Sequence, residues 1–137
     1  MTWGYDSRAA SVRVISPPSC PPSATRLEIR VPGADMNPYF ALAAVLLLGL
    51  RGVRNEIPLA LPPVAVMRAQ EEKGGSSGAV KLARSLEEAT KLFARQGSVA
   101  REVFGDEFVE HYAGTREHEV KLWREAVTNW EGTSSDL

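Results

Sequence analysis

The chain has 137 residues, of which 44% are apolar, and a net charge of −1 at pH 7. This length supports one domain with a modest core. The balanced charge excludes an overall field that would draw the chain to nucleic acid or to an anionic membrane. The longest apolar run, residues 39–50, is shorter than the roughly 20 residues of a membrane span. Cys20 is the only cysteine, and a free thiol fits a reducing compartment such as the cytoplasm.

The N-terminal part of the chain predicts two strands. In residues 8–15, Val12 and Val14 lie on one face and Arg13 on the other, because successive side chains of a strand alternate. A loop with four prolines follows in residues 16–22, and proline cannot serve a sheet ladder. Residues 25–31 form the second strand, which can pair with the first as a long-looped hairpin. Such a pair alone is marginal in water.

The second strand carries the most informative pattern of the chain, R-L-E-I-R-V in residues 26–31. Its apolar face, which we expect a core to cover, holds Leu27, Ile29 and Val31. Its charged face holds Arg26, Glu28 and Arg30, with neighbours roughly 7 Å apart. Arginine forks bind phosphate oxygens two at a time, and a carboxylate can hold Mg²⁺ or Mn²⁺. The alternative interpretation is a solvated ladder of alternating charges.

A helix is predicted over residues 37–54. Asn37 is a good N-cap, and Pro38 fits the first helical position. The helix is apolar on nearly every face up to Leu50, so we expect it to be buried. A helix of this kind needs partners on all sides, and this chain supplies few.

Residues 56–84 are predicted to be a flexible loop. The prolines at positions 58, 62 and 63 block regular structure, and residues 71–78 are polar and rich in glycine.

The remaining residues, 85–131, predict a helical segment, followed by a tail over 132–137. Ser85 and Glu88 form a capping box. It opens a helix that ends before Gly97, with Leu86, Ala89 and Phe93 facing inward. Further helix starts are predicted at Ser98, Asp106 and Thr115. The apolar stripe of the last helix consists of Val120, Trp123, Val127 and Trp130. Together these elements predict an α+β fold with two antiparallel strands and four to five helices.

Several separated motifs resemble the C-terminal catalytic region of the glutamine synthetase family. The string R-L-E-I-R-V-P-G-A-D-x-N-P-Y-x-A-L-A-A begins at Arg26. The R-A-A-S-V-R of residues 8–13 resembles the arginine strand of the family, and residues 85–89 and 127–131 also match. The resemblance runs from about residue 5 to residue 131 and implies a partial catalytic domain, with both strands belonging to a larger curved sheet. Family members carry a long N-terminal part, which includes a β-grasp domain and most of the metal ligands, and this chain lacks it.

The resemblance also implies roles for individual residues. Glu28 is similar to a metal-ligating carboxylate of the family. Two arginines resemble catalytic residues, namely Arg8, which would stabilise γ-glutamyl phosphate, and Arg30, which would contact the transferring phosphoryl group or the substrate carboxylate. Arg13 and Arg26 resemble arginines that hold ATP phosphates. For each of these residues the alternative is ordinary surface charge.

Arg8 carries an additional difficulty. The family usually has Asn immediately before this arginine, and here the residue is Ser7. Arg8 and Arg13 are five positions apart, so in an unbroken strand they point to opposite faces. A bend or bulge is needed for both to reach one site.

The function implied by the resemblance is that of an ATP-dependent ligase. Such an enzyme joins glutamate and ammonia through γ-glutamyl phosphate, uses ATP with Mg²⁺ or Mn²⁺, and assembles as a homo-oligomer. One carboxylate does not hold Mg²⁺ firmly, so we predict that the chain is inactive without the missing domain. The open alternatives are a γ-glutamyl-amine ligase segment, a non-catalytic remnant that binds a full-length paralogue, and a truncated gene product without an independent role.

Overall fold

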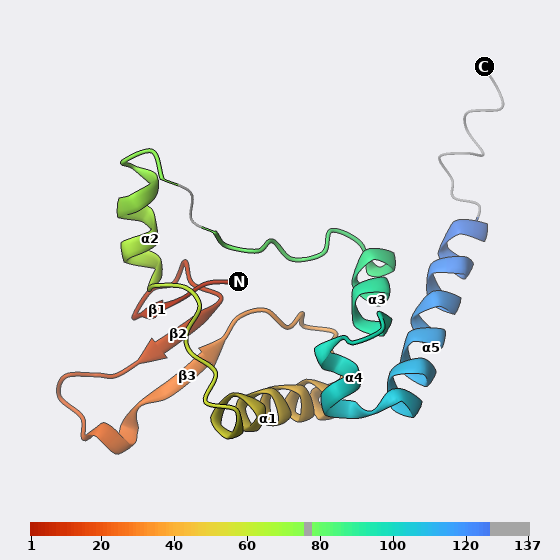
Figure 1. Cartoon of the computed structure of the whole chain (residues 1–137), viewed down its shortest axis with the longest axis horizontal. Helices are drawn as coiled ribbons and strands as arrows, with labels where there is room; N and C mark the ends of the chain where they lie inside the picture. The colour runs from red at the N-terminus through yellow and green to blue at the C-terminus, as the bar shows by residue number, and fades with distance from the viewer. Residues whose placement is uncertain (76–77, 127–137) are drawn as a thin grey trace. The chain divides into compact units, whose positions relative to one another are not determined.

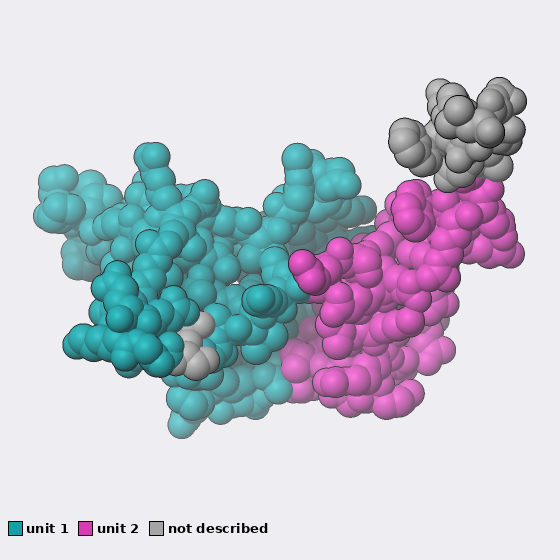
Figure 2. Space-filling model, turned by 90° about the horizontal axis from the view of Figure 1, so that it is seen from above, with its two compact units in different colours: residues 1–82 teal, residues 83–137 magenta. Residues whose placement is uncertain are grey.

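The computed structural model describes residues 1–75 and 78–126 of the chain. The chain forms two compact units, residues 1–82 and residues 83–137 (Figure 2). The first unit contains the sheet.

The first unit contains one sheet in the order β1-β2-β3 (Figure 1). Its strands are β1 (Trp3–Tyr5), β2 (Val12–Ile15) and β3 (Arg26–Ile29). β2 and β3 pair antiparallel, with Arg13 opposite Glu28, and this confirms the expected strand pair. A third strand, β1, pairs parallel to β2. The first predicted strand was too long, because residues 8–11 form a turn and β2 begins at Val12.

β1 is fixed by contacts with a distant part of the same unit. The indole Nε1 of Trp3 donates a hydrogen bond to the carbonyl of Leu61 at 2.8 Å. Gly4 is buried, and a Cβ at this position would lie 2.9 Å from Cγ1 of Val64. Gly4 therefore allows the chain around Val64 to approach β1 closely.

Helix α1 (Pro38–Arg54) begins where the sequence predicts. The side chain of Asn37 accepts hydrogen bonds from the amides of Tyr39 and Phe40, at 3.0 and 3.4 Å. The expected burial is wrong for this chain, because no residue of α1 is buried. An all-round apolar helix needs cover on every side, and the described residues leave α1 partly open, as Leu46 shows with 65% of its surface exposed.

Other apolar surfaces of the first unit are also open. Leu27 is 62% exposed, and Ile29 and Val31 are each 37% exposed. The expectation that a core covers this face of β3 is therefore wrong in the part of the chain that the structure describes.

The region predicted as a flexible loop contains a second helix, α2 (Val64–Glu71). Pro63 precedes its first residue, and Val64 and Met67 are buried. The prolines at 62 and 63 thus lead into a helix rather than prevent one, since a helix start tolerates proline. A short 3₁₀ turn, η1 (Pro22–Ala24), lies in the proline-rich loop between β2 and β3.

The second unit consists of α3 (Leu86–Ala94), α4 (Val99–Phe104) and α5 (Asp106–Glu125). Ser85 accepts a hydrogen bond from the amide of Glu88 at 3.1 Å, and Ser98 accepts one from the amide of Arg101 at 3.2 Å. Both predicted N-caps are confirmed. Between α4 and α5, Gly105 has a φ of +81°, a conformation that favours glycine.

Three expectations for the helical segment are wrong in whole or in part. Thr115 does not begin a helix, because α5 runs through it and its hydroxyl donates to the carbonyl of Tyr112 at 2.6 Å. On α3, Thr90 is buried and Leu86 is 41% exposed, whereas Phe93 faces the aromatic rings of α4 and α5 as expected. On α5, Trp123 is 77% exposed, so it does not face a core. Val127 and Trp130 of the predicted stripe, and the tail 132–137, lie outside the described residues.

Aromatic rings fill much of the interior of the second unit. The ring of Phe93 lies 5.6 Å from that of Tyr112, and the rings of Phe104 and Phe108 are 5.1 Å apart. Val109 and Ala113 of α5 are buried. Within the described ranges, no helix combines the length and apolar character needed to cross a membrane.

Candidate functional site

Three of the predicted site residues come together on the charged face of β2 and β3. Arg13 and Glu28 are directly opposed in the antiparallel register, and their side chains pair at 3.2 Å between Nη1 and Oε2. The other carboxylate oxygen of Glu28 lies 3.4 Å from Nε of Arg30. The alternation of β3 thus places Glu28 between two guanidinium groups.

Arg13 is the most enclosed arginine of this row. Its side chain is 22% exposed, compared with 39% for Arg30. Its Nη2 lies 3.4 Å from a carboxylate oxygen of Asp6, so both terminal nitrogens face a carboxylate. Its Nε is buried and has no hydrogen-bond partner in the structure as described. A buried donor without a partner is costly.

The other two predicted arginines stand apart from this row. Arg26 begins β3 opposite Ile15, and it is exposed. Arg8 is exposed in the turn between β1 and β2. Neither residue forms an ion pair within residues 1–75 and 78–126. The turn supplies the break in the strand that Arg8 requires, but the roles of all five residues stay predictions.

The catalytic-domain model of the glutamine synthetase family matches residues 1–134. The chain belongs to the glutamine synthetase family. The resemblance deduced from the separated motifs is thereby confirmed, and the mix of one open sheet and several helices agrees with the α+β expectation.

Relatives of this glutamine synthetase segment differ in the amine that their names specify. The chain is 43% identical to a glutamate–isopropylamine ligase of a Pseudomonas species over 95% of the chain and 27% of that protein. It is 38% identical to type-1 glutamine synthetase 2 of Dictyostelium discoideum over 95% of the chain and 24% of that protein. It is 32% identical to a γ-glutamylethanolamide synthetase of Streptomyces coelicolor over 96% of the chain and 26% of that protein. The chain thus spans about a quarter of the length of these relatives.

The residues present do not by themselves fit a firmly held divalent ion. Mg²⁺ requires near-octahedral oxygen ligands, and Glu28 supplies one carboxylate, whose oxygens already face Arg13 and Arg30. Among the described residues, no group of three or more His, Cys, Asp or Glu side chains is placed to hold a metal. A divalent ion at Glu28 would need further ligands from outside this segment.

Sequence reasoning missed one residue that contacts the charged row, which consists of Arg13, Glu28 and Arg30. Asp6 follows β1 and pairs with Arg13, but the sequence pattern did not predict β1. The signal that exists is the alternation within T-W-G-Y-D, which is too short to indicate a strand by itself.

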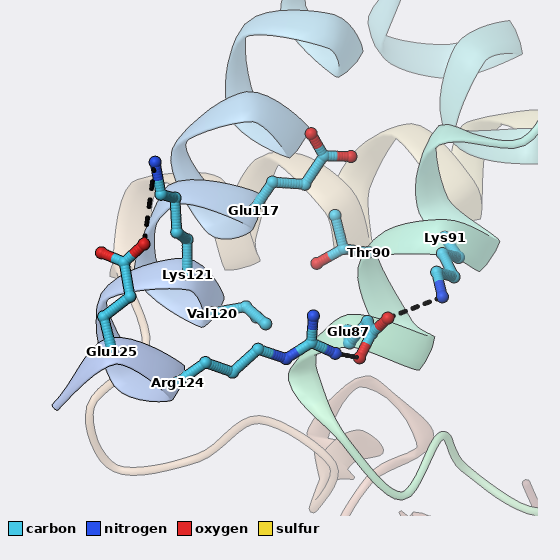
Figure 3. A pocket seen from close by; sticks show the side chains of 8 residues that line it. All are labelled: Glu87, Thr90, Lys91, Glu117, Val120, Lys121, Arg124 and Glu125. Atoms are coloured by element: carbon cyan, nitrogen blue, oxygen red, sulfur yellow. Dashed lines mark hydrogen bonds and ion pairs between the residues drawn. The ribbon is translucent and has the colours of Figure 1, made fainter. Parts of the chain in front are cut away.

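The second unit contains a hollow of about 360 Å³ between α3 and α5 (Figure 3). The carboxylate of Glu87 accepts a hydrogen bond from Lys91 at 2.7 Å and another from Arg124. Its pKa lies below the ordinary value, first because of the Lys91 hydrogen bond and then because of the Arg124 charge. Three acidic and three basic side chains line this hollow: Glu87, Glu117, Glu125, Lys91, Lys121 and Arg124. No predicted site residue lies here, and the balanced charge favours neither an anion nor a cation.

Proposed function

We propose that the chain is the segment of an ATP-dependent glutamate–ammonia ligase that supplies phosphate- and metal-contacting side chains. In this reaction the side-chain carboxylate of glutamate takes the γ-phosphoryl group of ATP, and ADP leaves. Ammonia then displaces phosphate from the γ-glutamyl phosphate, which gives glutamine. The observation that carries the proposal is the row Arg13–Glu28–Arg30 on one sheet face, with separations of 3.2 and 3.4 Å.

The charge arrangement suits this chemistry. Phosphoryl transfer spreads negative charge over the transferred group, and catalysis depends on positioning and on cationic partners. We assign Arg30 and Arg8 to the transferring phosphoryl group and the acyl phosphate, and Arg13 and Arg26 to the phosphates of ATP. The position of Arg13 supports this assignment, because its terminal nitrogens lie on the sheet face beside Glu28, with Nη1 at 3.2 Å from Oε2. Glu28 would contribute one carboxylate ligand to a divalent ion.

In this proposal, ligase activity requires the rest of the catalytic domain. The chain spans about a quarter of its relatives, so we expect no glutamate-dependent phosphate release from the chain alone. Assembly as a homo-oligomer, or with a full-length paralogue, is part of the same proposal. So is a cytoplasmic location, which suits the free and exposed thiol of Cys20.

A γ-glutamyl-amine ligase is the second candidate. It is favoured by the 43% identity to glutamate–isopropylamine ligase, which exceeds the 38% identity to the Dictyostelium glutamine synthetase. The two candidates share the phosphoryl transfer and differ in the acceptor that attacks the acyl phosphate.

A chimera tests the shared chemistry. Residues 1–134 replace the matching segment of the Pseudomonas ligase, and ATP-dependent phosphate release is measured with glutamate and isopropylamine. We expect an active enzyme in which Glu28→Gln or Arg30→Lys lowers kcat about 100-fold. The matched control is Glu56→Gln, since Glu56 forms no ion pair in the described part of the same unit. Full activity of the Glu28→Gln chimera contradicts the assigned role, and a folded but inactive chimera favours the non-catalytic remnant.

A second chimera tests whether this segment influences the choice of acceptor. The same residues replace the matching segment of the Dictyostelium glutamine synthetase, and ammonia and isopropylamine are compared as acceptors in both hosts. By resemblance, acceptor choice depends largely on residues outside this segment, so we expect the preference to follow the host. A shift toward isopropylamine in both hosts instead assigns the amine-ligase function to this segment.

A further inference from the structure

Asp6 occupies an unusual backbone position beside the charged row. It directly follows β1 and has a φ of +47°. Its amide donates a hydrogen bond to the carbonyl of Val14 at 3.0 Å, which extends the pairing of β1 with β2. Aspartate is among the few residue types that adopt the left-handed region readily. Non-glycine residues in this region cluster at functional sites.

The carboxylate of Asp6 provides Arg13 with a second anchor. Nη2 of Arg13 lies 3.4 Å from Oδ1 of Asp6, and Nη1 lies 3.2 Å from Oε2 of Glu28. The two carboxylates therefore hold different nitrogens of one guanidinium. Arg30, in contrast, has a single carboxylate neighbour in this row, Glu28, at 3.4 Å.

We propose that Asp6 is a positioning residue that holds the guanidinium of Arg13 over the sheet independently of Glu28. Glu28 can then turn to another partner without releasing Arg13. This inference rests on the proposed function in one respect. The proposed function identifies the anionic ligand of Arg13 as a phosphate-bearing substrate. Asp6 itself touches no reacting atom; it fixes the direction in which Arg13 presents its remaining donors.

The electrostatics of the row support this role. Asp6, Arg13, Glu28 and Arg30 alternate in sign, so their charges cancel. Suppose that Glu28 turns away from Arg13 and that Asp6 is absent. Arg13 then loses both carboxylates that pair with it in the described residues. A long side chain without such a partner regains its rotamer freedom. With Asp6 in place, one charge-assisted contact remains. The backbone hydrogen bond of Asp6 to β2 makes that anchor part of the sheet.

Nuclear magnetic resonance of the 137-residue chain tests the proposal, at a concentration at which sedimentation velocity shows the folded monomer. The order parameter of the Arg13 Nε–H group is compared in the wild type, Asp6→Asn, Glu28→Gln and the double variant. We expect Arg13 to stay ordered in Glu28→Gln and to fall below about 0.6, the range of flexible groups, in the double variant. Equal values for Glu28→Gln and the double variant overturn the proposal.

A matched control is available in the same unit. Glu56 also has a φ of +47°, so Glu56→Gln removes a carboxylate from the same backbone conformation away from Arg13. In the Glu56→Gln variant, the order parameter of the Arg13 Nε–H group is expected to equal that of the wild type. A fall as large as that in the double variant overturns the proposal. Asparagine tolerates the left-handed region. If Asp6→Asn nevertheless loses the amide signals of β1 and β2, Asp6→Gly, which adopts this φ without strain, replaces it.

Titration with inorganic tripolyphosphate separates this proposal from the proposed function. A shift of the Arg13 Nε signal in the wild-type chain supports the phosphate-binding role. If the signal shifts neither in the wild type nor in any variant, the phosphate-binding role is contradicted, but the anchoring role of Asp6 is not. The order parameters still decide whether Asp6 anchors Arg13, because they are measured without the anion.

Discussion

Glu87 connects two helices of the second unit through a single carboxylate. It lies on α3, accepts a hydrogen bond from Lys91 one turn later, and pairs with Arg124 of α5 (Figure 3). These contacts stabilise the ionised form, so the pKa of Glu87 is lowered on folding, first by Lys91 and then by Arg124. A carboxylate with a lowered pKa stabilises the fold above its unfolded value, and this contribution is lost as the pH falls through the folded value.

Glu87→Gln is therefore expected to destabilise the protein at pH 7 and to change little at acid pH. The unfolded pKa of glutamate is about 4.3, so the difference from the wild type should shrink from about pH 4 downward. Urea unfolding at a series of pH values measures this difference. Glu117→Gln is the control, because Glu117 lines the same hollow and forms no ion pair among the described residues. A difference that does not vary with pH contradicts the prediction.

The charged row shows how far single residues can be predicted from strand alternation. Alternation alone puts Glu28 and Arg30 on one face. The register of β2 against β3, which the structure supplies, brings Arg13 opposite Glu28, and all three lie within ion-pair distance. Asp6 could not be predicted in the same way, because its contact with Arg13 depends on the register of β1 against β2. Local periodicity does not specify which strands pair or in which register.

At the scale of elements, the two serine caps of the second unit differ in what they bind. Ser85 accepts a hydrogen bond from the amide of Glu88. Ser98 accepts one from the amide of Arg101 and also donates to the carbonyl of Phe93 at 2.8 Å. Ser98 is 7% exposed, so loss of its hydroxyl leaves a partly buried carbonyl without this donor.

Ser85→Ala is expected to lower the free energy of unfolding by about 1 kcal/mol, the usual effect of a lost N-cap. Ser98→Ala is expected to lower it by about 2 kcal/mol, because a second hydrogen bond is lost as well. Chemical denaturation of the two variants measures both values against Ser19→Ala in the exposed proline-rich loop. An effect of Ser85→Ala that equals or exceeds that of Ser98→Ala shows that the Phe93 hydrogen bond contributes nothing.

Element starts were predictable where a side chain caps the backbone. Asn37 and Ser85 both accept the expected amide hydrogen bonds. α2 was missed because the prolines before it were interpreted only as breakers of structure. Thr115 is a possible N-cap by residue type, but threonine also occurs inside helices. Within α5 its hydroxyl donates to the carbonyl of Tyr112, one turn earlier. Sequence identifies the residues that can cap a helix, and tertiary packing decides which of them do so.

At the scale of the whole molecule, many large apolar side chains of the first unit are exposed. On α1, Leu42 and Leu46 are 61% and 65% exposed and lie one turn apart on the same face. β1 and β3 are both edge strands, and Leu27 of β3 is 62% exposed. Unpaired strand edges and open apolar faces promote association between chains.

The 137-residue chain is therefore expected to be poorly stable or to self-associate. Sedimentation velocity at rising concentration should show species larger than the monomer, because burial of each exposed leucine is favourable by about 1.5–3 kcal/mol. Leu42→Gln combined with Leu46→Gln should shift the distribution toward the monomer at equal concentration. Leu122→Gln on α5, where the leucine is 54% exposed, controls for a general loss of apolar surface and should shift it less. A chain that stays monomeric at all concentrations and unfolds sharply at high temperature contradicts the prediction, because its apolar faces would then be tolerated in water without a partner.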